Sequence, residues 1–181
     1  MSKTSAAAAK ALTSNYFELF GLVPAFALDV ERLEAAYREI QSKVHPDRFV
    51  HAGDAERRAS MQMTTRVNEA YRTLKSPVQR AKYLLELNGV DVGFETNTAM
   101  PREFLMQQME IRERLEEARD TVALDLLQKD LEVQARNIEN RIEEEIDGKQ
   151  DFTAARELVR KLMFLERFGE DIDAAHESLE S

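Results

Sequence analysis

The stretch Val44-His45-Pro46-Asp47-Arg48-Phe49 separates two segments in which apolar residues recur every three or four positions. That spacing gathers apolar side chains on one face of a helix, so helices are predicted over about 30–44 and 54–75. Pro46 cannot continue a helix, and it holds the preceding residue, His45, in an extended geometry. The stretch therefore predicts a stiff polar turn at the tip of a helical hairpin.

The same helical spacing extends outward in both directions. A short helix is expected from about Asn15 to a stop at Gly21, and Ser76-Pro77 has the residues of a helix start. No segment shows the sustained alternation that a strand requires, so we predict an all-α protein. The remaining helices are expected over about 77–88, 101–118, 122–146 and 152–168, and the acidic residues after Gly169 either extend the last helix or fray.

The segment 89–100 divides the chain, because it combines glycines and small polar residues with no helical spacing. We expect a disordered tail over 1–13, a helical domain over 14–88, a linker over 89–100 and a three-helix bundle over 101–181. Residues 1–90 carry 13 Lys/Arg and 10 Asp/Glu, a net charge of +3, whereas residues 91–181 carry 12 and 24, a net charge of −12. This difference predicts two surfaces that serve different partners.

The composition excludes several classes of protein. The 181 residues include no cysteine and carry a formal charge of −9, so a disulfide framework, a cysteine-ligated metal site and a cysteine nucleophile are impossible. The excess of acids argues against nucleic-acid binding, which needs Lys and Arg against phosphate. No apolar run reaches the ~20 residues that span a bilayer, and we expect no membrane association. The lack of cysteine fits a reducing compartment, so a cytoplasmic location is expected.

Several roles are open to His45 and Asp47 on the residues alone. A fixed polar tip is suited to protein docking, because little conformational entropy is lost on binding. With His51 the pair could ligate a metal, although the paired histidines of a zinc protease helix are missing. General acid–base chemistry is also possible, but no partnered nucleophile or phosphate-binding glycine loop accompanies it. An isolated His-Pro-Asp sequence is most simply an ordinary loop.

The surrounding residues change that interpretation. The helix after the turn contains Val67-Asn-Glu-Ala-Tyr-Arg-Thr-Leu74, and the next contains Arg80-Ala-Lys-Tyr83. Together with the turn, they closely resemble the J-domain of J-protein co-chaperones. Further segments resemble the HscB family, the J-type co-chaperones of bacterial iron–sulfur cluster assembly: Tyr16-Phe-Glu-Leu-Phe-Gly-Leu22, His45-Pro-Asp-Arg-Phe49, Ala81-Lys-Tyr-Leu-Leu85 and Phe104-Leu-Met106.

The resemblance implies a J-domain over 14–88 that docks on a specialised HscA-type chaperone and stimulates its ATPase. It implies that the C-terminal bundle binds the IscU-type scaffold protein. The chain itself is then no enzyme, with no catalytic residue, metal site or cofactor, and we expect a monomer. The chaperone-binding residues implied are His45, Pro46, Asp47, Arg38, Lys43 and Arg48.

Two departures from the usual J-domain pattern bear on which kind of chaperone is bound. The helix before the turn is usually strongly basic, but here Arg32, Arg38 and Lys43 alternate with three glutamates, so its charge is close to balanced. This weakens charge steering toward a general DnaK-type chaperone and fits a dedicated partner. Arg48 stands where many J-domains have lysine, which keeps the charge but changes the geometry of its donors.

The helix expected at 101–118 presents two apolar faces. At ~100° per residue, Phe104, Ile111, Leu115 and Ala118 form one stripe, which we expect in the bundle core. A second face combines large apolar residues with carboxylates, as an interaction surface does. It comprises Leu105, Met106, Met109, Glu110, Glu113 and Glu117.

The last helix offers one further candidate for this surface. Phe164 lies ~240° from Leu158 and off the stripe formed by Leu158, Leu162 and Leu165, so an exposed anchor is expected there. The resemblance implies that Phe164 and the second face bind the scaffold.

Each of these assignments has an alternative. Leu105 and Met109 could instead pack on the third helix or the linker, and Phe164 on the N-terminal domain. At the level of function, the bundle could serve another client or self-associate. A small helical hydrolase using His45 and Asp47 is the remaining alternative.

Overall fold

A computed structural model describes residues 14–45, 47, 52–93 and 101–179. Pro46, Arg48, His51, the expected tail over 1–13 and most of the expected linker lie outside the described residues. The chain divides into two compact units, Met1–Leu84 and Leu85–Ser181. Every regular element within the described ranges is a helix, which confirms the all-α prediction.

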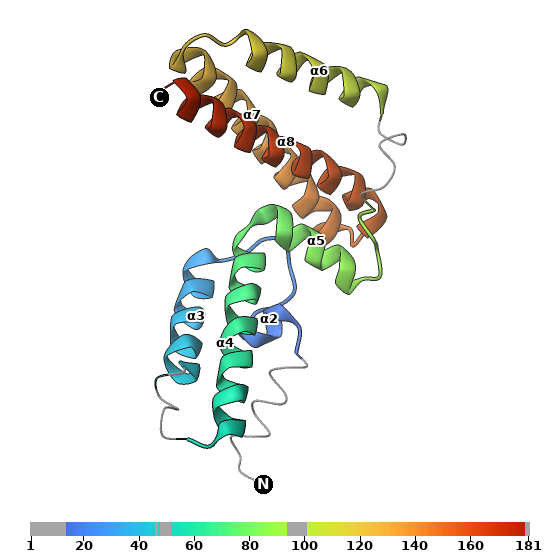
Figure 1. Cartoon of the computed structure of the whole chain (residues 1–181). Coiled ribbons are helices and arrows are strands. Elements are labelled where there is room, and N and C mark those ends of the chain that lie inside the picture. Colours follow the sequence, from blue (N-terminus) through green and yellow to red (C-terminus); the bar gives the residue numbers. More distant parts are fainter. Residues whose placement is uncertain (1–13, 46, 48–51, 94–100, 180–181) are drawn as a thin grey trace. The chain divides into compact units, whose positions relative to one another are not determined.

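The first unit is built around a helical hairpin. Helix α3 (Val30–Val44) and helix α4 (Asp54–Lys75) lie side by side, and the short helix α2 (Tyr16–Leu19) packs on α4 (Figure 1). Helix α5 (Pro77–Leu87) follows, and the Ser76 hydroxyl accepts the Gln79 N–H at its start. These bounds match the sequence-based helices closely, because prolines and capping residues mark the ends.

Capping and packing explain why these segments fold as they do. The Asn15 side chain accepts the Glu18 N–H, and Glu18 accepts the Asn15 N–H in return, which forms a capping box at α2. Asp29 accepts the Arg32 N–H and starts α3. The core between the helices consists of buried apolar side chains: Phe17, Phe20, Phe26, Leu33, Met63, Val67, Ala70, Leu74, Val78, Ala81 and Leu84.

Two stacked pairs of tyrosines join the elements of this unit. Tyr37 of α3 stacks on Tyr71 of α4 with ring centroids 4.1 Å apart, and its hydroxyl donates to Asn68 Oδ1 at 2.9 Å. Tyr16 of α2 stacks on Tyr83 of α5 at 4.4 Å, and the Tyr16 N–H donates to the Tyr83 hydroxyl. Partial burial and the neighbouring Glu69 carboxylate raise the pKa of Tyr16.

Arg80 is a charged side chain in this core, and only 7% of its surface is exposed. Its Nε donates to the Phe26 carbonyl at 2.8 Å, and Nη1 donates to the Leu74 carbonyl at 2.6 Å. The guanidinium also lies over the Phe26 ring. Arg80 thereby ties the segment before α3 to the end of α4, and the hydrogen bonds offset the cost of burying its charge.

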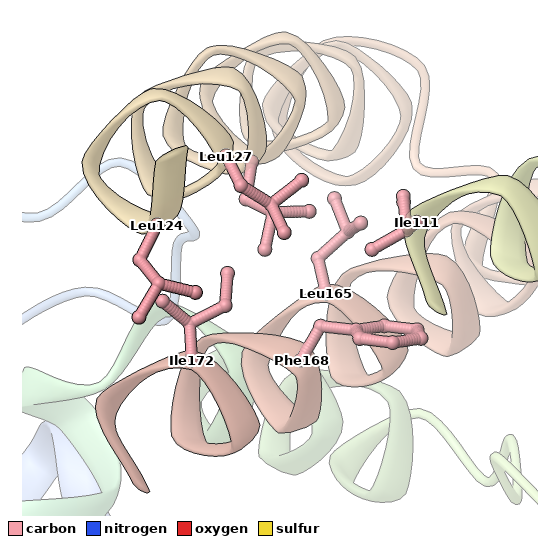
Figure 2. Close-up of a cluster of buried hydrophobic side chains, with 7 residues drawn as sticks. Ile111, Leu124, Leu127, Leu165, Phe168 and Ile172 are labelled. Carbon is pink, nitrogen blue, oxygen red and sulfur yellow. The ribbon is translucent and has the colours of Figure 1, made fainter. Parts of the chain in front are cut away.

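The second unit contains α6 (Arg102–Glu117), α7 (Thr121–Glu143) and α8 (Phe152–Leu179), which confirms the three expected helices. Helix α7 ends in a π-helical turn over Glu144–Gly148 before the chain reverses into α8. Helices α7 and α8 lie side by side along their length, and α6 packs on one side of this pair (Figure 1). Figure 2 shows the core of this unit, in which Leu124 and Leu127 of α7 face Leu165, Phe168 and Ile172 of α8. Ile111 of α6 lies beside Leu165 and Phe168 at one side of this cluster.

Helix α8 runs well beyond the expected end at 168. Ile172 is fully buried and Ala175 packs partly against the same core, so the apolar stripe continues past Gly169. Of the two outcomes left open, the acidic residues extend the helix.

The beginning of the expected linker is fixed to this unit. Val92 is buried, and Arg160 of α8 donates to the Val92 carbonyl at 2.6 Å and to the Gly93 carbonyl at 3.2 Å. Residues 94–100 lie outside the described residues. Over the described ranges, no helix combines the length and apolarity needed to cross a membrane.

Candidate functional site

His45 and Asp47 are exposed directly after α3. His45 has φ −57° and ψ 130°, so the chain leaves helical geometry where proline follows. Half of the His45 side chain and 86% of the Asp47 side chain are exposed. Both lie at the loop between α3 and α4, as the sequence predicted, whereas their neighbours Pro46 and Arg48 lie outside the described residues.

The His45 ring nitrogen Nδ1 can interact with Asp47 in two mutually exclusive ways. The Asp47 N–H donates to His45 Nδ1 at 3.3 Å, which requires that nitrogen to be unprotonated. The same nitrogen lies 3.5 Å from Asp47 Oδ2, a contact that becomes an ion pair only when the ring is protonated. In the neutral arrangement, the ring proton is on Nε2, so the imidazole offers a hydrogen-bond donor.

Two residues that the sequence reasoning missed fix the start of this loop. Ser60 and Thr64 of α4 both donate their hydroxyl protons to the Val44 carbonyl, at 2.6 and 3.1 Å. A signal was available, since Ser60 prolongs the stripe of Met63, Val67 and Leu74 toward the loop but is polar. What the sequence could not supply was the register of α4 against α3.

The two expected basic residues of α3 have carboxylates one helical turn earlier. Arg38 lies 3.8 Å from Glu34, and Lys43 donates to Glu39 at 2.6 Å. The Lys43 hydrogen bond lowers the pKa of the Glu39 carboxyl. Arg38 and Lys43 are solvent-exposed, but the surface around them is one of paired charges and no purely cationic patch.

Helix α6 presents the two faces that its sequence indicated. Phe104 and Ile111 are buried, which confirms their place in the core, whereas Met106 and Met109 are about 60% exposed. Leu105 is half-buried at the edge between the two faces. The three carboxylates of the second face, Glu110, Glu113 and Glu117, are also exposed.

Phe164 differs from its expected exposure. It is half-buried and meets Phe104 and Phe168 edge-on, with centroid separations of 5.5 and 4.5 Å. The expectation of a freely exposed anchor was therefore wrong, because α6 covers the side of α8 on which Phe164 lies.

Cations surround this aromatic cluster, a feature that sequence reasoning missed. Lys161 lies over the Phe104 ring at 5.4 Å, and Arg112 lies over the Phe168 ring at 5.8 Å. Arg114 of α6 also pairs with Asp130 of α7 at 2.7 Å. These contacts hold α6 on the other two helices and so fix the direction of its exposed face.

The hypothesis that His45, Asp47 and His51 bind a metal gains no support within the described ranges. No group of three or more His, Asp and Glu side chains there is placed to hold a metal ion. His51, the third ligand of that alternative, lies outside those ranges.

Family descriptions match both units. The DnaJ domain matches residues 15–83, and the HSCB C-terminal oligomerisation domain matches residues 100–173. A relative from Aromatoleum aromaticum, described as a co-chaperone protein HscB homolog, is 50% identical over 94% of this chain and 98% of its own length.

Solved structures agree with the sequence matches. HscB from Vibrio cholerae is 34% identical, with a TM-score of 0.81 over 92% of this chain and 99% of that protein. The human co-chaperone HscB is 31% identical, with a TM-score of 0.87 over 90% of this chain and 82% of that one.

A helical hairpin that carries His-Pro-Asp between its two helices is the defining feature of a J-domain co-chaperone. The C-terminal unit and the relatives narrow that class further. The chain belongs to the HscB co-chaperone family.

Proposed function

We propose that this protein binds an IscU-type iron–sulfur scaffold protein and delivers it to an HscA-type chaperone, whose ATPase it stimulates. The chaperone then clamps the scaffold, which favours cluster release. The protein acts without a catalytic residue, metal or cofactor of its own, as a monomer in the cytoplasm. Nucleic acid and membranes have no part in this function.

The observation that supports chaperone binding is the exposed pair of His45 and Asp47, which directly follows α3. Their side chains face solvent, while the peptide before them is held by two hydroxyls of α4. Side chains that are already held close to their docked position lose little entropy on docking, so they are suited to a brief contact with a chaperone. We assign Arg38, Lys43, Pro46 and Arg48 to the same docking surface.

The nearly balanced charge of α3 supports a dedicated chaperone. Arg38 and Lys43 lie beside Glu34 and Glu39, so long-range steering by a positive surface is weak. Recognition then depends more on the shape and hydrogen bonding of the partner. A specialised HscA-type chaperone meets this condition better than a general one.

The exposed face of α6 supports the client half. Met106 and Met109 form an apolar centre, with Leu105 at its edge and Glu110, Glu113 and Glu117 around it. Methionine side chains adapt to irregular partner surfaces, and an apolar patch with a polar rim is typical of a protein interface. The rim indicates that the scaffold presents basic residues around an apolar contact. We assign Phe164 a supporting part, because it packs beneath α6.

Two sites on one chain raise the local concentration of the scaffold at the chaperone, as in any bivalent adaptor. The test is the steady-state ATPase rate of an HscA-type chaperone, measured with and without this protein and with and without the scaffold. We expect the protein to raise the rate and the scaffold to raise it further.

The decisive variant is His45→Gln, which removes the imidazole but keeps a polar side chain. We expect it to abolish ATPase stimulation and to leave scaffold affinity unchanged. His176→Gln, the same change in the second unit, is the matched control and should stimulate normally. Stimulation retained by His45→Gln would contradict the J-domain role. Stimulation without scaffold binding would instead favour a J-domain adaptor for another client.

A further inference from the structure

The last carbonyl of α3 is held from outside its own helix. Ser60 Oγ and Thr64 Oγ1 both donate to the Val44 oxygen. A carbonyl oxygen has two acceptor sites, so the two hydroxyls fill both. Val44 ends α3, and its carbonyl belongs to the peptide that leads into His45.

This arrangement replaces the usual end of a helix. The final carbonyls of a helix lack intrahelical partners, and a glycine in left-handed geometry commonly supplies them through its cap hydrogen bonds. Here the cap residue is His45, with φ −57°, and the next residue is a proline without an N–H. The direction in which the chain leaves α3 is therefore fixed by α4.

The burial of Ser60 shows that this contact is part of the packed hairpin. Ser60 is 6% exposed, and among the described residues only it and Arg80 are polar side chains buried to this extent. A buried hydroxyl needs a partner, and Val44 supplies it. Thr64, four residues later, lies on the same face of α4 and reaches the same oxygen.

We propose that Ser60 and Thr64 are positioning residues for chaperone docking. By fixing the peptide before His45, they hold His45 and Asp47 in the orientation that the chaperone binds, so less order has to be imposed on docking. This inference rests on the proposed function of the His-Pro-Asp motif. Loss of these hydroxyls should therefore weaken the affinity for the chaperone without changing the structure of the docked complex.

The test is a titration of the chaperone ATPase with the double variant Ser60→Ala, Thr64→Val. We expect the concentration for half-maximal stimulation to rise about tenfold, the factor that corresponds to a loss of about 1.4 kcal/mol. Maximal stimulation should be unchanged, because the docked motif keeps its residues. Backbone amide signals of His45 and Asp47 should shift in the nuclear magnetic resonance spectrum and exchange faster with solvent.

Three further variants separate positioning from general stability. Thr65→Val removes an exposed hydroxyl that donates to Met61 of its own helix, so it is the matched control and should behave as the parent. Thr64→Ser keeps the hydroxyl, so its concentration for half-maximal stimulation should equal that of the parent. Thr64→Val alone is nearly isosteric and serves if the double variant does not fold, as judged by circular dichroism.

The outcomes distinguish this inference from the proposed function. An unchanged half-maximal concentration in a folded variant, an equal loss in Thr65→Val, or a loss of maximal stimulation alone would each overturn the positioning role. A parent protein that gives no stimulation would contradict the proposed function instead. In that case the amide signals still decide whether Ser60 and Thr64 order the motif.

Discussion

Arg80 carries its charge among the apolar side chains of the first unit. Its guanidinium satisfies the Phe26 and Leu74 carbonyls, which come from segments far apart in the chain. A buried carbonyl without a hydrogen-bond donor destabilises a fold, so Arg80 stabilises the first unit by donating to both carbonyls.

We therefore expect Arg80→Ala to lower the free energy of unfolding of the first unit by about 2–4 kcal/mol. The measurement is urea denaturation followed by circular dichroism. Arg72→Ala, which removes an exposed arginine of α4, is the matched control and should cost far less. Equal losses for the two variants would show that the buried hydrogen bonds contribute little.

The ion pair between Lys75 and Glu34 gives a pH-dependent contribution. Lys75 Nζ donates to Glu34 Oε1 at 3.2 Å, and this hydrogen bond lowers the pKa of the Glu34 carboxyl in the folded state. A carboxyl with a lower pKa in the folded than in the unfolded state stabilises the fold at neutral pH. That contribution is lost as the pH falls through the folded-state pKa.

Lys75→Met should therefore reduce stability at neutral pH, and its difference from the parent should shrink on acidification. Urea denaturation at neutral pH and below the folded-state pKa of Glu34 measures this. Lys129→Met, which changes an exposed lysine of α7, should follow the parent curve at both pH values. A difference that persists unchanged at low pH would show that Lys75 acts through packing alone.

At the scale of the element, α6 has one face in the core of the second unit and another that we propose to bind the scaffold. Phe104 and Ile111 face the core, whereas Met106 and Met109 remain about 60% exposed. Substitutions on the second face should therefore affect partners without affecting the fold. Phe164 does not belong to this group, since its contacts with Phe104 and Phe168 make it part of the packing.

The double variant Met106→Ala, Met109→Ala should weaken scaffold binding by about 1–4 kcal/mol with little change in thermal stability. Isothermal titration calorimetry measures the affinity. The matched control is Val122→Ala, Leu126→Ala, which removes two similarly exposed apolar side chains from α7. An unchanged affinity for the methionine variant would remove α6 from the binding surface.

The sequence predicted some of these elements well because their signals are local. The proline at 46, the helix start at Ser76-Pro77 and the stripe from Phe104 to Ala118 can each be recognised within a short stretch of sequence. The features that were predicted wrongly or missed depend on how one helix packs against another. Angles along α8 place Phe164 off its stripe, but they do not show that α6 covers that side. The hydrogen bonds of Ser60 and Thr64 to Val44 likewise depend on the register of α4 against α3.

At the scale of the whole molecule, the two partners should differ in their response to salt. The rim of Glu110, Glu113 and Glu117 belongs to the half of the chain with a net charge of −12, whereas α3 has paired charges. Charges at the rim of an interface act mainly on the rate of association.

We therefore expect scaffold association to slow as salt is raised and chaperone docking to change less. Stopped-flow association rates over a range of ionic strength measure both. The triple variant Glu110→Gln, Glu113→Gln, Glu117→Gln should remove most of the salt dependence for the scaffold while leaving the chaperone rate unaffected. A parent rate that does not depend on salt would rule out basic residues opposite this rim.

The stacked tyrosine pairs give the intact chain a built-in optical reporter. The four tyrosines are Tyr16, Tyr37, Tyr71 and Tyr83, all within the first unit, and the sequence contains no tryptophan. The second unit contains phenylalanine but neither tyrosine nor tryptophan. Tyrosine fluorescence, and near-ultraviolet dichroism at wavelengths where tyrosine but not phenylalanine absorbs, therefore report on the first unit alone. An unlabelled, full-length sample can thus reveal whether adding a scaffold variant that lacks both tryptophan and tyrosine alters the first unit.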